Sequence, residues 1–349
     1  MGSKTAALPK KLQNAITERM RQSLLKGDTP FDKARLADAA SFVGALAADR
    51  TFGRSSMAIE SISDERRLTR IAIVNDDMPF IVDSVAATIA ALGLSIDRLV
   101  HPVIPVERDD KGKLIGIPDN DPDDAYWESM IYIEAARVDA KTRRQLQEGL
   151  KETLADVRAA VSDWPKLQQA MTQDADRIRD TDEEGADLLD WLNSGMLTQL
   201  GHVTRHRDGT QRDQLGICRK SARELLAEAS YERAFAWFAK KDNRRRPLII
   251  KANHLSNVHR RVPLDLLIVP IQEGGETIAL SVHAGVWTSA ALAAPPRNVP
   301  RLRRELEALR ERHGFDDGRG GQAQDHDVNL CAKLGEACGR CGAGCGQIL

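Results

Sequence analysis

The chain has 349 residues, of which 42% are hydrophobic and 4% aromatic, so it can fill the cores of two or three domains. Its 50 lysines and arginines nearly balance 51 aspartates and glutamates, which excludes a general attraction to nucleic acid or to an anionic membrane. No window holds 18 apolar residues, and the N-terminus lacks the apolar core of a secretory signal. We therefore expect a cytoplasmic protein without a membrane segment.

The N-terminal part of the chain predicts helices. Between residues 9 and 50, apolar residues recur at three- and four-residue spacing on both sides of a break at residues 27–30. We expect residues 1–60 to form a helical segment that packs on another element.

Residues 61–170 predict a first sheet-and-helix domain. The predicted elements are, in order, a strand at 68–74, a helix at 80–93, a strand at 96–108, a hairpin at 109–117, a strand at 128–138 and a helix at 141–164. This order is that of a ferredoxin-like unit, an antiparallel sheet covered on one face by helices.

A polar segment at 173–185 separates this domain from a second α+β domain, residues 171–316. The elements predicted there are a helix at 186–195, strands at 197–206, 247–255, 265–271 and 277–287, and a charged helix at 301–313. The predicted fold class is thus α+β, with a helical segment followed by a ferredoxin-like unit and a second α+β unit that has more strand.

The last part, residues 317–349, is an irregular tail rich in glycine and cysteine. Four of the five cysteines lie in it, at positions 331, 338, 341 and 345. A shifted reading frame, a genuine disordered tail and a metal site are the three interpretations that the sequence leaves open.

Several stretches in register resemble the N-terminal part of the large bacterial NAD-specific glutamate dehydrogenases. They span roughly residues 68 to 315 and read IVNDDMPFIVDSV, GLSIDRLVHPVIPVERD, ESMIYIE, ADVRAAVSDW, KANHLSNVHRRVPLDLLIV and GVWTSAAL. The resemblance implies ACT-like regulatory modules, so that both α+β domains are expected to be ACT-like, that is, ferredoxin-like units of antiparallel sheet and helices. It also implies an enzyme that converts L-glutamate to 2-oxoglutarate and ammonia with NAD, whose catalytic core lies far downstream and is expected to be missing here.

The resemblance therefore implies a regulatory or assembly-forming part, inactive alone. An amino-acid effector, a second copy and the downstream catalytic domain are the partners that it suggests. The alternative is a stand-alone ACT-type module that senses an amino acid or contacts another protein. We predict no nucleic-acid partner, because the basic runs at 66–67 and 244–246 lack interleaved aromatic residues.

The residues themselves predict no catalytic or cofactor-binding group. Hydride transfer needs a nicotinamide site, and no GxGxxG motif opens a helix after a strand. We expect no cofactor in this chain, with NAD implied only for the full-length family. We predict no metal site either, because His254 and His259 are five residues apart and His283 is remote in sequence.

The first candidate site is the turn Asn75, Asp76, Asp77 and Met78, between the first predicted strand and helix of the ferredoxin-like unit. One interpretation is a helix cap, in which Asp76 or Asp77 accepts from first-turn amides and Pro79 begins the helix. The other is a small-molecule site, because the N-terminus of a helix attracts a carboxylate. Most ACT modules carry a glycine where this chain has Phe80, so the ring would fill the ligand's space.

The second candidate site is the set Lys251, Asn253, His259 and Arg260. These polar groups follow or interrupt a strand, and they predict contact with an anion or a protein partner. The alternative is a solvated strand end and loop. The resembled family has an arginine where this chain has Leu255, which removes one cation from such a site.

Overall fold

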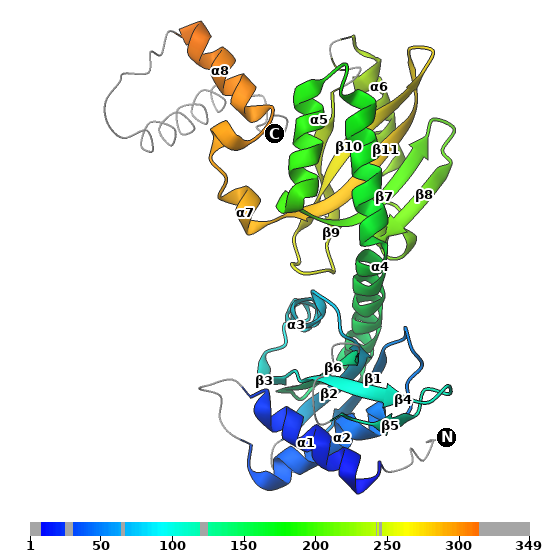
Figure 1. The fold of residues 1–349 in the computed structure, drawn as a ribbon, viewed down its shortest axis with the longest axis vertical. Coiled ribbons are helices and arrows are strands. Elements are labelled where there is room, and N and C mark those ends of the chain that lie inside the picture. Colours follow the sequence, from blue (N-terminus) through cyan, green and yellow to red (C-terminus); the bar gives the residue numbers. More distant parts are fainter. Residues whose placement is uncertain are drawn as a thin grey trace. The chain divides into compact units, whose positions relative to one another are not determined.

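The structure is a computed structural model that describes residues 8–24, 31–63, 67–118, 125–241, 243 and 246–313. The chain divides into two compact units, unit 1 (residues 1–157 and 257–261) and unit 2 (residues 158–256 and 262–349) (Figure 1). Both combine helices with an antiparallel sheet, which confirms the predicted α+β class. The predicted division into four parts stays a prediction.

The sheet of unit 1 has a ferredoxin-like centre. Its strands are β1 (Ser56–Ser61), β2 (Leu68–Asp76), β3 (Ile96–Val100), β4 (Val103–Arg108), β5 (Leu114–Gly116) and β6 (Tyr126–Ala136). They are arranged β1-β2-β6-β4-β5, and β3 also pairs with β6. The first strand, β1, was missed in the sequence, and it occupies the edge beside β2.

Helices cover both faces of this sheet, whereas the sequence predicted a cover on one face. The helices are α1 (Lys10–Gln22), α2 (Lys33–Ala47), α3 (Ile81–Ala91) and the first part of α4 (Ala140–Ile178). Successive side chains of a strand point to opposite faces. Thus Ala72 and Val74 of β2 pack with α1 and α2, while Ile71 and Ile73 pack with α3 and α4 (Figure 1).

Helix α4 is longer than the sequence predicted. It has 39 residues and contains Pro165, where we expected it to end. Proline removes one backbone hydrogen bond and normally kinks or ends a helix. Here the helical spacing of buried side chains continues beyond it through Leu167, Met171, Ala175 and Ile178, and their burial offsets that loss.

Unit 2 contains the second sheet. Its elements are α5 (Glu183–Trp191), β7 (Leu197–His206), β8 (Gln211–Gly216), α6 (Glu228–Ala239), β9 (Leu248–Leu255), β10 (Pro263–Glu273), β11 (Glu276–Trp287), α7 (Ser289–Leu292) and α8 (Leu302–His313), with short helical turns at Leu192–Met196, Ile217–Arg219 and Pro296–Asn298. The strand order is β8-β7-β11-β10-β9.

The two faces of the second sheet are covered by different helices. The second part of α4 and helix α5 pack on Leu267 and Val269 of β10 (Figure 1). On the opposite face, the guanidinium groups of Arg205 and Arg207 lie over the rings of Tyr231 and Phe235 of α6. The alternation along β7 therefore assigns its even-numbered residues 202 and 204 to the α4 side.

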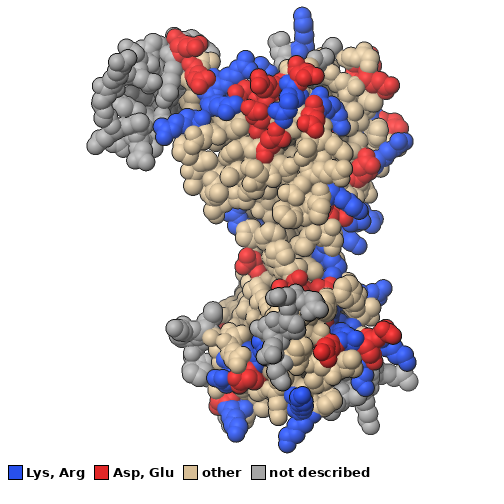
Figure 2. All heavy atoms as spheres, viewed as in Figure 1, with Lys and Arg blue, Asp and Glu red and all other residues tan. Residues whose placement is uncertain are grey.

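Some predicted features lie outside the described residues: the break at 27–30, Arg66, Arg244, Arg245 and the tail 317–349 with its cysteines. On the face drawn in Figure 2, basic and acidic side chains of the described residues are mixed rather than gathered by sign. Of the helices in the described part of the chain, none has both the length and the apolar character needed to cross a membrane.

Candidate functional site

The turn before α3 does not cap that helix. Asp76 accepts a hydrogen bond from Arg50 at 2.8 Å, and Asp77 accepts one from the Ser129 hydroxyl at 2.6 Å. The N-cap residue is Phe80, which makes no side-chain cap hydrogen bond. The helix-cap interpretation is therefore corrected, because Phe80 is the N-cap residue and the two carboxylates accept from Arg50 and Ser129 of unit 1.

The other two residues of this turn also contact unit 1. The side-chain amide of Asn75 donates to the carbonyl oxygen of Asp76 at 2.9 Å, and Asn75 is buried. Met78 packs against the apolar core beneath α3. The four predicted residues thus hold the turn in place.

Phe80 meets the second sequence motif at the start of α3. Its backbone has a φ of 68°, and that of His259 is 65°, both in the left-handed region. Their ring centroids are 5.2 Å apart. The backbone N–H of His259 donates to the Ser84 hydroxyl at 2.8 Å, and its Nδ1 lies 3.2 Å from Asp83. Two motifs about 175 residues apart in sequence therefore form one contact within unit 1.

The four residues of the second candidate site are divided between the two units. His259 and the half-buried Arg260 belong to unit 1, whereas Lys251 and Asn253 belong to unit 2. The ammonium of Lys251 pairs with Asp265 at 2.6 Å. Lys251 and Asn253 also line a pocket of about 420 Å³ together with α6. Each pair is therefore described within its own unit.

Unit 1 also contains a buried ionic network that the sequence did not reveal. The Arg50 side chain is 0% exposed and donates to Glu128 at 2.6 and 3.0 Å. It donates further to Asp76 and to the Tyr126 hydroxyl. Glu128 also accepts two hydrogen bonds from Arg108, at 2.6 and 2.8 Å. Burying charged groups costs free energy of desolvation, which their mutual attraction offsets only when their hydrogen bonds are also satisfied. The contacts of Arg50 and Glu128 provide such hydrogen bonds.

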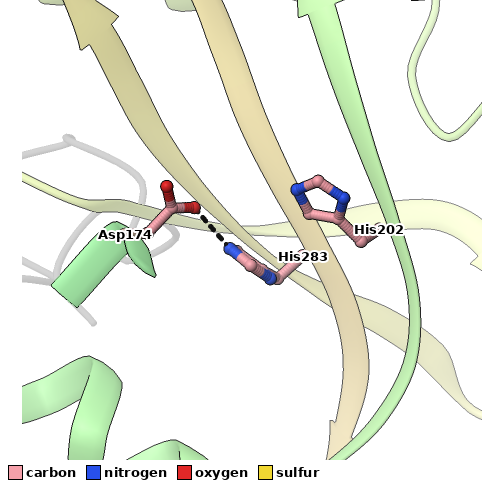
Figure 3. Close-up of side chains that lie close together, drawn as sticks. All are labelled: Asp174, His202 and His283. Carbon is pink, nitrogen blue, oxygen red and sulfur yellow. Dashed lines mark hydrogen bonds and ion pairs between the residues drawn. The ribbon is translucent and has the colours of Figure 1, made fainter. Parts of the chain in front are cut away.

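Unit 2 brings together Asp174 of α4, His202 of β7 and His283 of β11 (Figure 3). All three are buried, with exposures of 2%, 5% and 1%. The two histidines are direct cross-strand neighbours, and their ring centroids are 4.8 Å apart. His283 Nε2 lies 2.7 Å from a carboxylate oxygen of Asp174.

The hydrogen bonds of His202 fix its tautomer. Nδ1 lies 3.1 Å from the Asp213 carbonyl oxygen, which can only accept, so Nδ1 carries the proton. Nε2 lies 2.8 Å from the Ser281 hydroxyl and accepts from it. Burial, together with the nearby His283, lowers the pKa of His202 to about 4. His202 is therefore neutral at physiological pH.

Asp174 and His283 differ in how fully their polar atoms are paired. Asp174 binds both His283 and Arg177, whereas one ring nitrogen of His283 lacks a partner among the described residues. Burial would raise the pKa of Asp174, but the hydrogen bond and charge of His283, with Arg177, hold it below its ordinary value. His283 Nδ1 is buried and has no hydrogen-bond partner among the described residues. One ligand atom from each of Asp174, His202 and His283 lies within 4.8 Å of the others. These three atoms are close enough for one metal ion to bind all of them after small side-chain movements.

The sequence reading missed this cluster because it sought histidines close together in the chain. It compared His283 with His254 and His259 and judged it remote. Pairing of β7 with β11 places His283 opposite His202 instead. The only local signal was a histidine at a core position of each predicted strand.

Comparison with known proteins relates part of the chain to a known protein family. Residues 34–150 match the family described as glutamate dehydrogenase, ACT1 domain. This part of the chain, about a third of its length, is thus similar to that family. That match covers α2, the whole sheet of unit 1 and the start of α4.

The NAD-specific glutamate dehydrogenase of Halomonas elongata is 28% identical over 275 residues, which are 71% of this chain and 17% of that protein. The enzyme of the same name from Pseudomonas aeruginosa is 27% identical over 274 residues, 71% of this chain and 16% of that protein. The matched part of this chain spans about a sixth of the length of each of these relatives. A solved RNA-binding light-oxygen-voltage receptor aligns with 81% of this chain and 92% of its own, but its TM-score of 0.17 and 10% identity support no conclusion.

Proposed function

We propose that this chain is a regulatory or assembly-forming portion of an NAD-specific glutamate dehydrogenase. The reaction of such an enzyme converts L-glutamate and NAD to 2-oxoglutarate, ammonia and NADH. The observation that carries the proposal is the ACT1 match, which coincides with the complete sheet of unit 1. A cytoplasmic location is part of the same proposal.

The junction between β2 and α3 supports a role other than dinucleotide binding. A nicotinamide-binding fold places a glycine-rich turn between a strand and a helix, so that the pyrophosphate approaches the helix N-terminus. Here that junction reads Asn-Asp-Asp-Met-Pro-Phe and contains no glycine that would let a pyrophosphate approach the backbone. We therefore expect no glutamate oxidation by this chain alone.

The proposed effector is a small amino acid, and the proposed partners are a second copy or the catalytic part of the enzyme. Phe80 and His259 mark the place in unit 1 where an effector would approach α3. Replacing Phe80 with glycine keeps the left-handed backbone easy to adopt and opens the space now filled by the ring.

The purified 349-residue chain tests this proposal in three measurements. NADH formation from glutamate and NAD should be absent, and robust turnover would overturn the regulatory assignment. A thermal-shift screen of amino acids should find a stabilising ligand, since a ligand at 100 times its Kd adds about 2.7 kcal/mol. Sedimentation should show self-association. A monomer that responds to no amino acid would contradict both the effector-binding role and the assembly role.

A matched pair of variants locates the effector. Phe80→Gly should change the affinity for the amino acid found in the screen. Phe52→Ala should leave that affinity unchanged, because Phe52 is a 70% exposed phenylalanine elsewhere in unit 1. Equal effects of the two variants would place the effector away from α3.

A further inference from the structure

We propose that Asp174, His202 and His283 bind one divalent first-row transition-metal ion in unit 2. This site is independent of the regulatory function proposed above. The three residues supply two imidazoles and one carboxylate, a donor set typical of zinc and of non-haem iron(II). Calcium and magnesium prefer an all-oxygen shell, so this donor set does not favour them.

The positions of the three ligands follow from rigid elements. His202 and His283 are opposite each other on adjacent strands, in the register of β7 and β11. Asp174 projects from α4 over the same face of the sheet (Figure 3). One ligand atom from each lies within 4.8 Å of the others, so small side-chain movements suffice to surround an ion. Three protein ligands leave a fourth position for water or for another molecule.

His202 already has the arrangement expected of a metal ligand. Its Nδ1 proton is held by the Asp213 carbonyl oxygen, so the Nε2 lone pair faces Ser281. Metal-ligating histidines usually donate their other ring N–H to a carbonyl or carboxylate in this way. The Ser281 hydroxyl can rotate away and release Nε2 to an ion.

His283 supplies the second imidazole of the site. It is 1% exposed, and its Nδ1 has no hydrogen-bond partner among the described residues. Its Nε2, 2.7 Å from the Asp174 carboxylate, is the nitrogen that would ligate an ion shared with Asp174 and His202, and the ion would take the place of the hydrogen bond between them. The nearby Arg177 competes for Asp174, but its side chain is 38% exposed and can turn to solvent.

The direct test is a titration of the full chain, stripped with a chelator, with Zn²⁺ followed by calorimetry and with Co²⁺ followed by absorbance. We expect one ion per chain, in a tetrahedral or five-coordinate cobalt spectrum without thiolate-to-metal charge transfer. A third titration uses iron(II) under anaerobic conditions. Comparing its affinity with that of Zn²⁺ shows which of the two metals the site prefers. No saturable binding of any of the three ions would overturn the proposal.

Variants then locate the ion. His202→Gln, His283→Gln and Asp174→Asn should each weaken binding by about 100-fold or more. The matched control is His254→Gln, a half-buried histidine on β9 of the same sheet, which should bind as the parent chain does. Unchanged binding in the three cluster variants would overturn the site.

The tail cysteines need a control of their own. The combined variant Cys331→Ser, Cys338→Ser, Cys341→Ser and Cys345→Ser should retain the ion. Should a cluster variant fail to fold, anomalous scattering from a metal-loaded crystal of the parent chain still decides the location. Density beside His202 and His283 supports the proposal, and density elsewhere overturns it.

Discussion

The two units both bury charged or titratable groups, but they satisfy them to different extents. In unit 1, Arg50 and Glu128 each have several partners, and Arg108 completes the network. In unit 2, His283 has one ring nitrogen paired with Asp174 and the other without a partner among the described residues. The network of unit 1 is closed within the protein, whereas the cluster of unit 2 is the place where we propose that an ion binds.

Breaking the network of unit 1 should give the largest effect. Arg50→Ala should lower the free energy of unfolding by about 3–5 kcal/mol, because it removes one of the two guanidinium groups that lie 2.6 Å from the buried Glu128 carboxylate. Urea unfolding followed by circular dichroism measures this. Arg21→Ala, which removes an exposed pair with Glu18, is the control and should change little. A small effect at Arg50 would mean that the network contributes no more than a surface pair.

Acid should weaken unit 2 through His202. Its pKa falls from 6.5 to about 4 on folding, so below pH 6.5 the unfolded chain takes up a proton that the folded chain does not. The stabilisation is complete above pH 6.5 and decreases as the pH falls to about 4, by roughly 3 kcal/mol in total.

Urea unfolding in the presence of a chelator, repeated from pH 7 to pH 4, measures this loss. His202→Gln has no titrating group at that position, so its stability should depend less on pH over the same window. Parallel pH profiles for the parent chain and the variant would contradict the assignment to His202.

The smallest expected effect concerns Phe80. Both Phe80→Ala and Phe80→Gly remove the ring contact with His259. In the left-handed backbone conformation at this position, alanine has a steric penalty that glycine does not have. Phe80→Gly should therefore be more stable than Phe80→Ala by about 1 kcal/mol. Thermal unfolding of the pair measures this difference, and equal stability would mean that the turn relaxes out of the left-handed region.

The sequence predicts local elements of this fold well where one period dominates. The strands at 68–76 and 126–136 and the helix at 81–91 follow the predicted ranges closely. Strand β1 was missed because its residues are only half-buried and show no clear alternation. The end of α4 was misplaced at Pro165, since a local rule about proline cannot weigh the burial of Met171 against the sheet.

Local sequence patterns predict the candidate sites less well than they predict the strands and helices. The turn before α3 was located from its sequence, but its role was not, because Arg50 and Ser129 are the partners of its aspartates and lie far away in the chain. His202 and His283 are brought together only by the register of two strands. Local spacing carries no information about that pairing.

The most direct test of the contrast between the two units is the thermal unfolding of the chelator-stripped full chain with and without one equivalent of Zn²⁺. An ion that binds only the folded state raises the unfolding temperature. We predict a rise for the parent chain and for His254→Gln, and none for His283→Gln. No rise in the parent chain, or an equal rise in His283→Gln, would contradict a metal site at the incompletely satisfied cluster.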